Sequence, residues 1–190
     1  LDMEHISQKW KWIFAFNVLF ILMLLTPLGV ERNGNRAWLD ADWMPTSIQP
    51  AEIVKMSFTL LLAKQFGYYK DEWEMRGWEP VMFTAAHTLF MAGLISLVSK
   101  DVGSALVYVV IFAGIAFAAG VKLRWFALGG GAAGALVLLL VIFDKIPGYM
   151  VKRFQVLLDH SYDPSGVGFQ QTRSLLALGS GRLFGQGLFN

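Results

Sequence analysis

The sequence has no cysteine and few charged residues. The absence of cysteine excludes a disulfide framework, a zinc site built on cysteine and a thiol nucleophile. Charged residues make up 16% of the chain, whereas soluble domains have about 25%. The net charge of +2 gives no reason to expect a nucleic-acid partner. These shortages point away from a secreted disulfide scaffold, a soluble domain and a nucleic-acid-binding protein.

Apolar residues are abundant instead, and they lie in long runs. Hydrophobic residues form 55% of the chain, and about five runs have the ~17–20 residues needed to cross the ~30 Å hydrocarbon core of a bilayer. We therefore predict an all-α fold, a polytopic transmembrane helical bundle that forms a single membrane domain over residues 1–190. Gly29 and Gly120 predict helix ends, and Pro50 and Pro80 predict helix starts. The predicted spans are 12–29, 50–67, 81–98, 102–120 and 124–143.

Lysine and arginine are unevenly distributed between the two ends of these spans. Basic loops tend to stay in the cytoplasm, so residues 68–79 and 121–124 are predicted to face the cytoplasm and residues 31–48 the outside. Residues 144–190 then form an extracytoplasmic loop region. Because the sequence starts at Leu1 and stops within this polar segment, we expect it to be a piece of a longer chain. The more basic side collects Lys9, Lys11, Lys64, Lys70, Arg76, Lys122 and Arg124.

Two charged residues, Glu52 and Lys55, fall within the second predicted span and share one helix face because they are three positions apart. An ionisable group there is costly, so we expect Lys55 to face the bundle or a wet cavity and to have a carboxylate partner. Asp101 is the best candidate for that partner, and Glu52 is the near alternative. A second interpretation of Glu52 is equally open: it closes a capping box in which Gln49 is the cap.

Polar residues beside the later spans also have structural interpretations. Asp101 precedes the fourth span, where it can cap the helix and still pair with Lys55. Asp163, Pro164 and Gly166 fit a type I turn, so we interpret Asp163 as a residue that shapes its loop. His87, in the middle of the third span, is predicted to hydrogen-bond between helices, since no second histidine or acidic residue lies near it in the sequence.

The glycines near the end of the chain do not form a nucleotide site. Residues 179–187 contain two Gly-x-Gly pairs, but no Gly-Lys-Ser/Thr follows them, and no predicted strand precedes them. A phosphate loop of the nucleotide-binding type is therefore rejected.

Four polar motifs follow one another along the chain. They are Arg36-Ala37-Trp38 with Gln49-Pro50-Ala51-Glu52-Ile53-Val54-Lys55; Lys100-Asp101-Val102-Gly103; Asp163-Pro164-Ser165-Gly166-Val167-Gly168-Phe169-Gln170 with Arg173-Ser174; and Gly179-Ser180-Gly181 with Gly185-Gln186-Gly187. In this order among the spans, they resemble the SEDS family of shape, elongation, division and sporulation proteins, which includes FtsW, RodA and SpoVE. The resemblance covers nearly the whole chain. Ala51 stands where the family usually has serine, and Lys100 where it has proline.

The resemblance implies a ten-helix peptidoglycan glycosyltransferase in the bacterial cytoplasmic membrane. Such enzymes polymerise lipid II at the outer face of that membrane, in division, elongation or sporulation, alongside a class B penicillin-binding protein. This chain then corresponds to helices three to seven plus most of the large outer loop. The family's essential aspartate follows that loop, in a motif resembling His-Thr-Asp-Phe, and is therefore expected beyond Asn190. This sequence has no such motif, so no catalytic residue is assigned within it, and the piece alone is predicted to be inactive.

The chemistry of lipid II defines what a site for it requires. It needs a membrane groove, cations for the diphosphate, and a carboxylate that deprotonates the attacking sugar hydroxyl. No cofactor or protein-bound metal is evident, although the sequence leaves a divalent cation open. The expected partners are lipid II, the penicillin-binding protein and membrane lipids. The candidate cavity residues are Arg36, Glu52, Lys55, Asp101, Arg153 and Arg173.

Two non-enzymatic alternatives remain. One is a lipid II binder or flippase, which should have polar residues along a continuous path between the two membrane faces. The other is a membrane scaffold that recruits a penicillin-binding protein, which would not need Lys55 inside the membrane. The polar groups cluster towards the predicted outer side, which favours chemistry at that surface.

Overall fold

The computed structural model describes residues 9–32, 34–41, 43, 45–73, 77–145, 148–159, 166, 168–182, 185 and 187. Over these ranges the chain is mainly α-helical, as predicted. It divides into two compact units, residues 1–129 and 130–190. The boundary falls inside a helix, α6 (Leu123–Ile142). The single membrane domain expected from the sequence stays a prediction.

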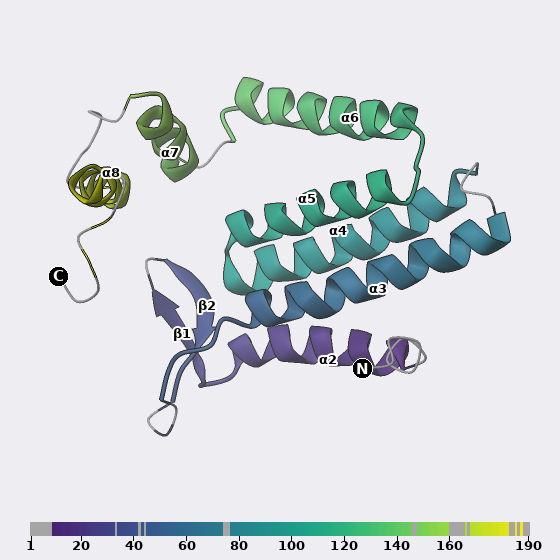
Figure 1. Ribbon diagram of the computed structural model, residues 1–190, viewed down its shortest axis with the longest axis horizontal. Coiled ribbons are helices and arrows are strands. Elements are labelled where there is room, and N and C mark those ends of the chain that lie inside the picture. The colour runs from purple at the N-terminus through teal and green to yellow at the C-terminus, as the bar shows by residue number, and fades with distance from the viewer. Residues whose placement is uncertain are drawn as a thin grey trace. The chain divides into compact units, whose positions relative to one another are not determined.

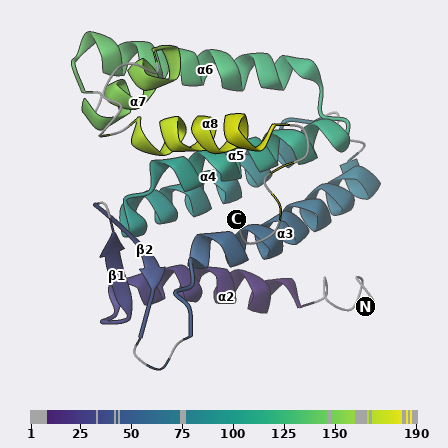
Figure 2. The ribbon, with the colours of Figure 1, turned by 60° about the vertical axis from the view of Figure 1, so that its left-hand side comes forward.

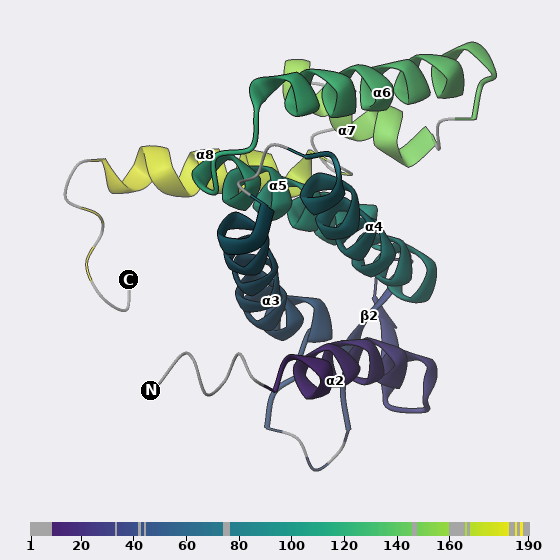
Figure 3. The same cartoon turned by 90° about the vertical axis from the view of Figure 1, so that its right-hand side faces the viewer.

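Four helices pack side by side in the first unit (Figures 1 and 3). Helix α3 contacts α2, α4 and α5, and α4 packs along α5. The other three helices therefore hold α3, which has Glu52 and Lys55, in place. The helices are α2 (Trp10–Leu22), which continues as the 3₁₀ helix η1 (Met23–Leu25), α3 (Pro50–Trp73), α4 (Glu79–Ser99) and α5 (Val102–Ala118).

The predicted helix boundaries are confirmed at three positions. Pro50 begins α3, and Pro80 lies in the first turn of α4, where the missing N–H of proline leaves no hydrogen bond unmade. Gly120 follows α5 with a φ of 90°, a left-handed conformation that favours glycine. Lys100, between α4 and α5, also has a positive φ, of 56°, which turns the chain into the next helix.

A β-hairpin, which the sequence analysis did not predict, follows η1. Strand β1 (Gly29–Arg32) pairs antiparallel with β2 (Asn35–Leu39), and Leu39 forms a further bridge with Ile48. The prediction that Gly29 ends a helix is wrong, because Gly29 begins β1. The Asn-Gly pair at 33–34 is a strong hairpin signal, and Gly34 has the positive φ, 83°, that such a turn requires.

Gly29 also sits where no side chain fits. A Cβ atom at this position would lie 1.9 Å from the backbone oxygen of Leu24 and 2.9 Å from Nε of Arg36. The close approach lets the hairpin fold back against η1. Glycine is thus required here for space.

The interior of the first unit combines aromatic and aliphatic residues with hydroxyl groups that hydrogen-bond to the backbone of their own helix. Phe58 and Tyr108 are fully buried, and their ring centroids lie 4.8 Å apart. Thr84 and Thr88 are also buried, and each hydroxyl donates to the carbonyl oxygen four residues earlier on α4, at 2.6 and 2.8 Å. A helix can therefore bury these hydroxyl groups without leaving a polar atom unpaired.

Two helices, α4 and α6, are long and apolar enough to cross a membrane. Two shorter apolar helices accompany them, α2 with η1 and α5. Each of the five predicted spans overlaps one of the helices α2 to α6, although the first helical segment ends at Leu25 and not at Gly29. The fold is a helical membrane bundle, as predicted.

The second unit contains the larger part of α6 and two further helices, α7 (Gly148–Leu158) and α8 (Phe169–Gly181), which are green and yellow in Figure 2. We had predicted a polar, glycine-rich loop region here, and its helices were not expected. Gln, Leu, Ala and Arg are good helix formers, and they supply most of the first ten residues of α8 in spite of the glycines at its end. The location of residues 144–190 outside the membrane stays a prediction.

Candidate functional site

Lys55 and Glu52 form an ion pair in the first two turns of α3. Lys55 Nζ lies 2.7 Å from Glu52 Oε1, and the two side chains are 22% and 55% exposed. The predicted carboxylate partner of Lys55 is therefore present, but the preference for Asp101 was wrong. The pair is also less enclosed than we expected, because more than half of the Glu52 side chain is accessible.

Asp101 instead caps α5, as its second interpretation predicted. Its Oδ1 accepts the backbone N–H of Ser104 at 3.0 Å, and its Oδ2 accepts the Ser104 hydroxyl at 2.6 Å. The side-chain amide of Gln49 approaches the same Oδ2 at 3.5 Å. Both carboxylate oxygens of Asp101 therefore accept hydrogen bonds at the start of α5, while Lys55 pairs with Glu52 on its own helix.

The capping-box interpretation of Gln49 and Glu52 is not supported. The Gln49 side chain points to Asp101, while the Glu52 carboxylate accepts from Lys55. The two residues are linked only through the backbone hydrogen bond from Glu52 N to Gln49 O, at 3.1 Å. Gln49 therefore ties the start of α3 to the start of α5.

Two side chains that the sequence analysis overlooked hold α3 in position. The hydroxyl of buried Tyr108, on α5, donates to the carbonyl oxygen of Ala51 at 2.7 Å, one residue before Glu52. On the α2 side, the Ser57 hydroxyl donates to Oδ1 of fully buried Asn17 at 2.5 Å. A polar group that is buried on an apolar helix needs a hydrogen-bond partner. This requirement could have identified Tyr108 and Asn17 in the sequence as residues that link helices.

The candidate cation Arg36 supports the hairpin. Its guanidinium donates to the carbonyl oxygen of Thr26 at 2.9 Å, and its Nε is buried without a hydrogen-bond partner among the described residues. Next to it, Arg32 pairs with Asp40 at 2.7 Å and lies over the ring of Trp38, 5.5 Å from its centroid. Arg36 thus has a structural task, and Trp38 is part of the same surface of the hairpin.

The remaining cation candidates, Arg153 and Arg173, belong to the second unit. Arg153 is on α7, and its side chain lies outside the described set. Arg173 is on α8, with its guanidinium 5.2 Å from the ring centroid of Phe169. Neither observation assigns them a substrate contact, so their role stays a prediction.

The motif residues of the second unit lie in and around α8. Asp163 and Pro164 fall outside the described residues, so the type I turn stays a prediction. Gly166 and Gly168 precede α8, and Gly168 O accepts from the Thr172 N–H at 2.9 Å. The other motif positions are Gln170, Ser174, Gly179 and Gly181 within α8, and Gly185 and Gly187, whose φ angles are 70° and 92°. In the first unit, the motif residue Gly103 lies in the first turn of α5. A Cβ atom added at Gly103 would lie 3.3 Å from Oδ1 of Asp101.

The position expected for the catalytic aspartate is not tested by the structure. The resemblance puts this aspartate beyond Asn190, the last residue of the sequence, and Asn190 itself falls outside the described residues. That this chain holds no catalytic residue therefore stays a prediction.

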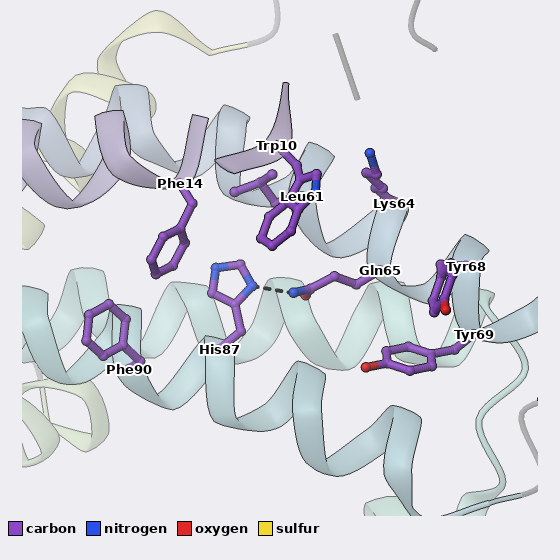
Figure 4. Close-up of a pocket in the computed structure, with 9 residues that line it drawn as sticks. All are labelled: Trp10, Phe14, Leu61, Lys64, Gln65, Tyr68, Tyr69, His87 and Phe90. Atoms are coloured by element: carbon purple, nitrogen blue, oxygen red, sulfur yellow. Dashed lines mark hydrogen bonds between the residues drawn. The ribbon is translucent and has the colours of Figure 1, made fainter. Parts of the chain in front are cut away.

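His87 connects two helices, as predicted. Its Nδ1 lies 3.0 Å from Oε1 of Gln65, which joins α4 to α3 (Figure 4). The rings of Phe14 and Phe58 contact the imidazole edge-on. Within the described part of the chain, no group of three or more histidine or acidic residues is arranged to hold a metal ion.

Known proteins resemble this chain over its whole length. Residues 1–190 match the FtsW/RodA/SpoVE family, described as cell cycle protein. The "Probable peptidoglycan glycosyltransferase FtsW" of Haemophilus influenzae is 34% identical over 100% of this chain and 47% of its own length. The protein of the same name from Pasteurella multocida is 34% identical over 96% of this chain and 46% of its own.

A solved structure gives the same result in three dimensions. It is described as "Structural coordination of polymerization and crosslinking by a peptidoglycan synthase complex" and aligns with a TM-score of 0.69 at 29% identity. The alignment covers 93% of this chain and 50% of the solved one. The chain thus spans about half the length of the curated relatives it matches. With a match to the family over all 190 residues, this chain belongs to the FtsW/RodA/SpoVE family.

Proposed function

We propose that the full-length protein is a peptidoglycan glycosyltransferase that builds glycan strands from lipid II. The observation that carries this proposal is the match of the whole chain to a family whose relatives are named probable peptidoglycan glycosyltransferases. The four sequence motifs and the membrane bundle agree with it. Division, elongation and sporulation are the cellular roles that this activity can serve.

The arrangement of α3 suits one part of this chemistry. Glycan polymerisation breaks the bond between a sugar and its diphosphate, while a hydroxyl of a second sugar forms the new bond and loses its proton. Negative charge grows on the departing diphosphate, and a fixed cation stabilises it. Lys55 is such a cation, because Glu52 holds its Nζ at 2.7 Å and α3 is anchored through Tyr108 and Ser57.

The other candidate residues contribute in different ways. Glu52 and Asp101 act as positioning residues, the first through Lys55 and the second through the cap of α5. Arg36, Arg153 and Arg173 are further candidates to contact the diphosphate. The base that accepts the hydroxyl proton is the family's aspartate, which belongs to a part of the protein beyond these 190 residues. The 190-residue chain alone is therefore expected to be inactive.

We place the protein in the bacterial cytoplasmic membrane as a multi-pass protein. Membership of a membrane family and two helices of spanning length support this location. A class B penicillin-binding protein is the proposed partner. The description of the solved structure refers to coordination of polymerization and crosslinking by a peptidoglycan synthase complex, and crosslinking is the task that such a partner would supply.

The experiment that tests this function uses the purified full-length protein, lipid II with a fluorescent label, and a gel that resolves glycan chains. A ladder of polymer is expected. The flippase alternative predicts no ladder, but transfer of labelled lipid II across the bilayer of proteoliposomes. The scaffold alternative predicts neither result.

A further inference from the structure

Helix α7, which follows α6 in the chain (Figure 1), is the most amphipathic of the described helices. At 3.6 residues per turn, its sequence places Lys152 on one side and, on the other, Met150, Val151, Phe154 and Leu158. A helix with one apolar and one basic side can lie in the membrane–water interface, with the apolar side buried about 5–10 Å. We propose that α7 lies along the membrane surface, with this apolar side against the lipid.

The burial of α7 is the reverse of that expected in a water-soluble protein. Val151 and Leu158, on the apolar side, are 42% and 87% exposed, whereas Val156 is 1% exposed. Val156 lies five positions after Val151 and two before Leu158, and therefore on another side of the helix. A surface helix in water turns its apolar side to the core of the protein. Here the chain buries a different side and leaves the apolar one open, which suits an apolar surrounding such as lipid.

The end of α6 brings α7 close to the membrane surface. The 20 residues of α6 extend about 30 Å, the thickness of the hydrocarbon core. The chain then turns at Asp144, which has a φ of 50°, and the N–H of Lys145 donates to the carbonyl oxygen of Leu140 at 2.8 Å. Such an end stops a helix and redirects the chain. From Ile142 to Gly148 the chain can reach about 20 Å at most, so α7 begins near the headgroups.

The charges of α7 suit the phosphate groups of lipid heads. The helix has two basic residues, Lys152 and Arg153, and no acidic one. Lys152 is exposed, and a lysine beside apolar surface can bury its methylene stem while its ammonium group stays in the polar layer. A purely apolar protein helix packed against α7 would give Lys152 no counter-charge, whereas a lipid surface provides both acyl chains and phosphates.

Electron paramagnetic resonance of the full-length protein in liposomes of phosphatidylethanolamine and phosphatidylglycerol tests the proposal. A nitroxide label is attached to single cysteines, and its collisions with oxygen, which concentrates in lipid, are compared with its collisions with a water-soluble nickel chelate. Residues 1–190 have no cysteine, and any cysteine in the rest of the protein is first replaced. Val151→Cys is compared with Lys152→Cys, and Leu158→Cys with Asp159→Cys. All four positions are exposed, and the two members of each pair point about 100° apart around the helix.

The labels at Val151 and Leu158 should meet more oxygen and less nickel than those at Lys152 and Asp159, at a depth of about 5–10 Å. Equal access of nickel at all four positions would overturn the proposal, because α7 would then be surrounded by water. Shielding of Val151 and Leu158 from both reagents would also overturn it, because another part of the full-length protein or a partner would then cover the apolar side. If a label at Leu158 prevents folding, the pair at 151 and 152 decides. This contact with lipid is independent of polymerisation, so failure of one leaves the other standing.

Discussion

Exchanging the charges of Glu52 and Lys55 separates the two roles that this ion pair can have. In the double variant Glu52→Lys/Lys55→Glu, an opposite-charge pair at positions i and i+3 is retained, but the ammonium group moves one turn towards the start of α3. If the pair only stabilises the helix, the exchange is nearly neutral. If Lys55 stabilises a departing diphosphate, as we propose, the exchange removes the cation from its place and activity is lost.

The magnitudes of the two effects differ enough to distinguish them. The Glu52 side chain is 55% exposed, and exposed helix pairs of this spacing contribute about 0.2–0.5 kcal/mol. Neither the exchange nor Glu52→Gln should therefore lower the free energy of unfolding by more than about 1 kcal/mol. Loss of one group that stabilises transition-state charge costs about 10²–10³-fold in rate, so the effect on polymerisation should greatly exceed the effect on stability.

The assay compares the initial rate of lipid II polymerisation and the thermal unfolding of the full-length variants. A matched control exchanges Arg32 and Asp40, a pair on the hairpin with the same 2.7 Å separation, and should leave the rate within about twofold of wild type. The reasoning is refuted if the Glu52/Lys55 exchange polymerises lipid II as fast as the wild type, because Lys55 would then serve the fold alone.

Three further predictions concern the fold. Asp101→Ala removes the cap of α5 and should lower the free energy of unfolding by about 1 kcal/mol, with Asp101→Asn less affected; equal melting of both variants and wild type would show that the cap is dispensable. Gly29→Ala places a Cβ atom 1.9 Å from a backbone oxygen of η1 and should destabilise the protein by about 1–3 kcal/mol, so a wild-type melting temperature would contradict the close approach. Cysteines at Gly34 and Ser165 should react with a membrane-impermeant thiol reagent in intact cells and one at Gly77 should not, and the opposite pattern would invert the predicted orientation.

The helices were predictable because long apolar runs set their existence and proline and glycine set several of their ends. Pro50 and Gly120 act through their own backbone chemistry, so neighbours are not needed to interpret them. Gly29 shows the limit of this reasoning. The same residue type ends a helix or begins a strand, and only the approach of the hairpin to η1 decides which.

The hairpin and α8 were missed for two different reasons. The hairpin has its signal in the Asn-Gly pair at 33–34, but the strands are four and five residues long and adjoin a much stronger apolar run. In α8 the Gly179 and Gly181 positions suggested a loop, although the residues before them favour a helix. In both cases the local sequence favoured the observed structure. The prediction followed the neighbouring apolar run for the hairpin and the glycines for α8 instead.

The need of Lys55 for a carboxylate partner was predictable from the sequence, but the identity of that partner was not. That Lys55 needs a carboxylate follows from its position in an apolar helix, and the carboxylate is there. Which carboxylate it is did not follow from the sequence, because Asp101 accepts from Ser104 and Gln49 while Lys55 pairs with Glu52. Gln49 is 52 residues away from Asp101, and only the fold brings them together.

Polymerisation of labelled lipid II by the purified full-length protein tests the central claim most directly, with the 190-residue chain assayed beside it. The account predicts a ladder of glycan chains from the full-length protein and none from the shorter chain, which lacks the family's aspartate motif. Polymer formed by the 190-residue chain would contradict our placement of the chemistry beyond Asn190. A folded full-length protein that forms no polymer, alone or with a class B penicillin-binding protein, would contradict the proposed function itself.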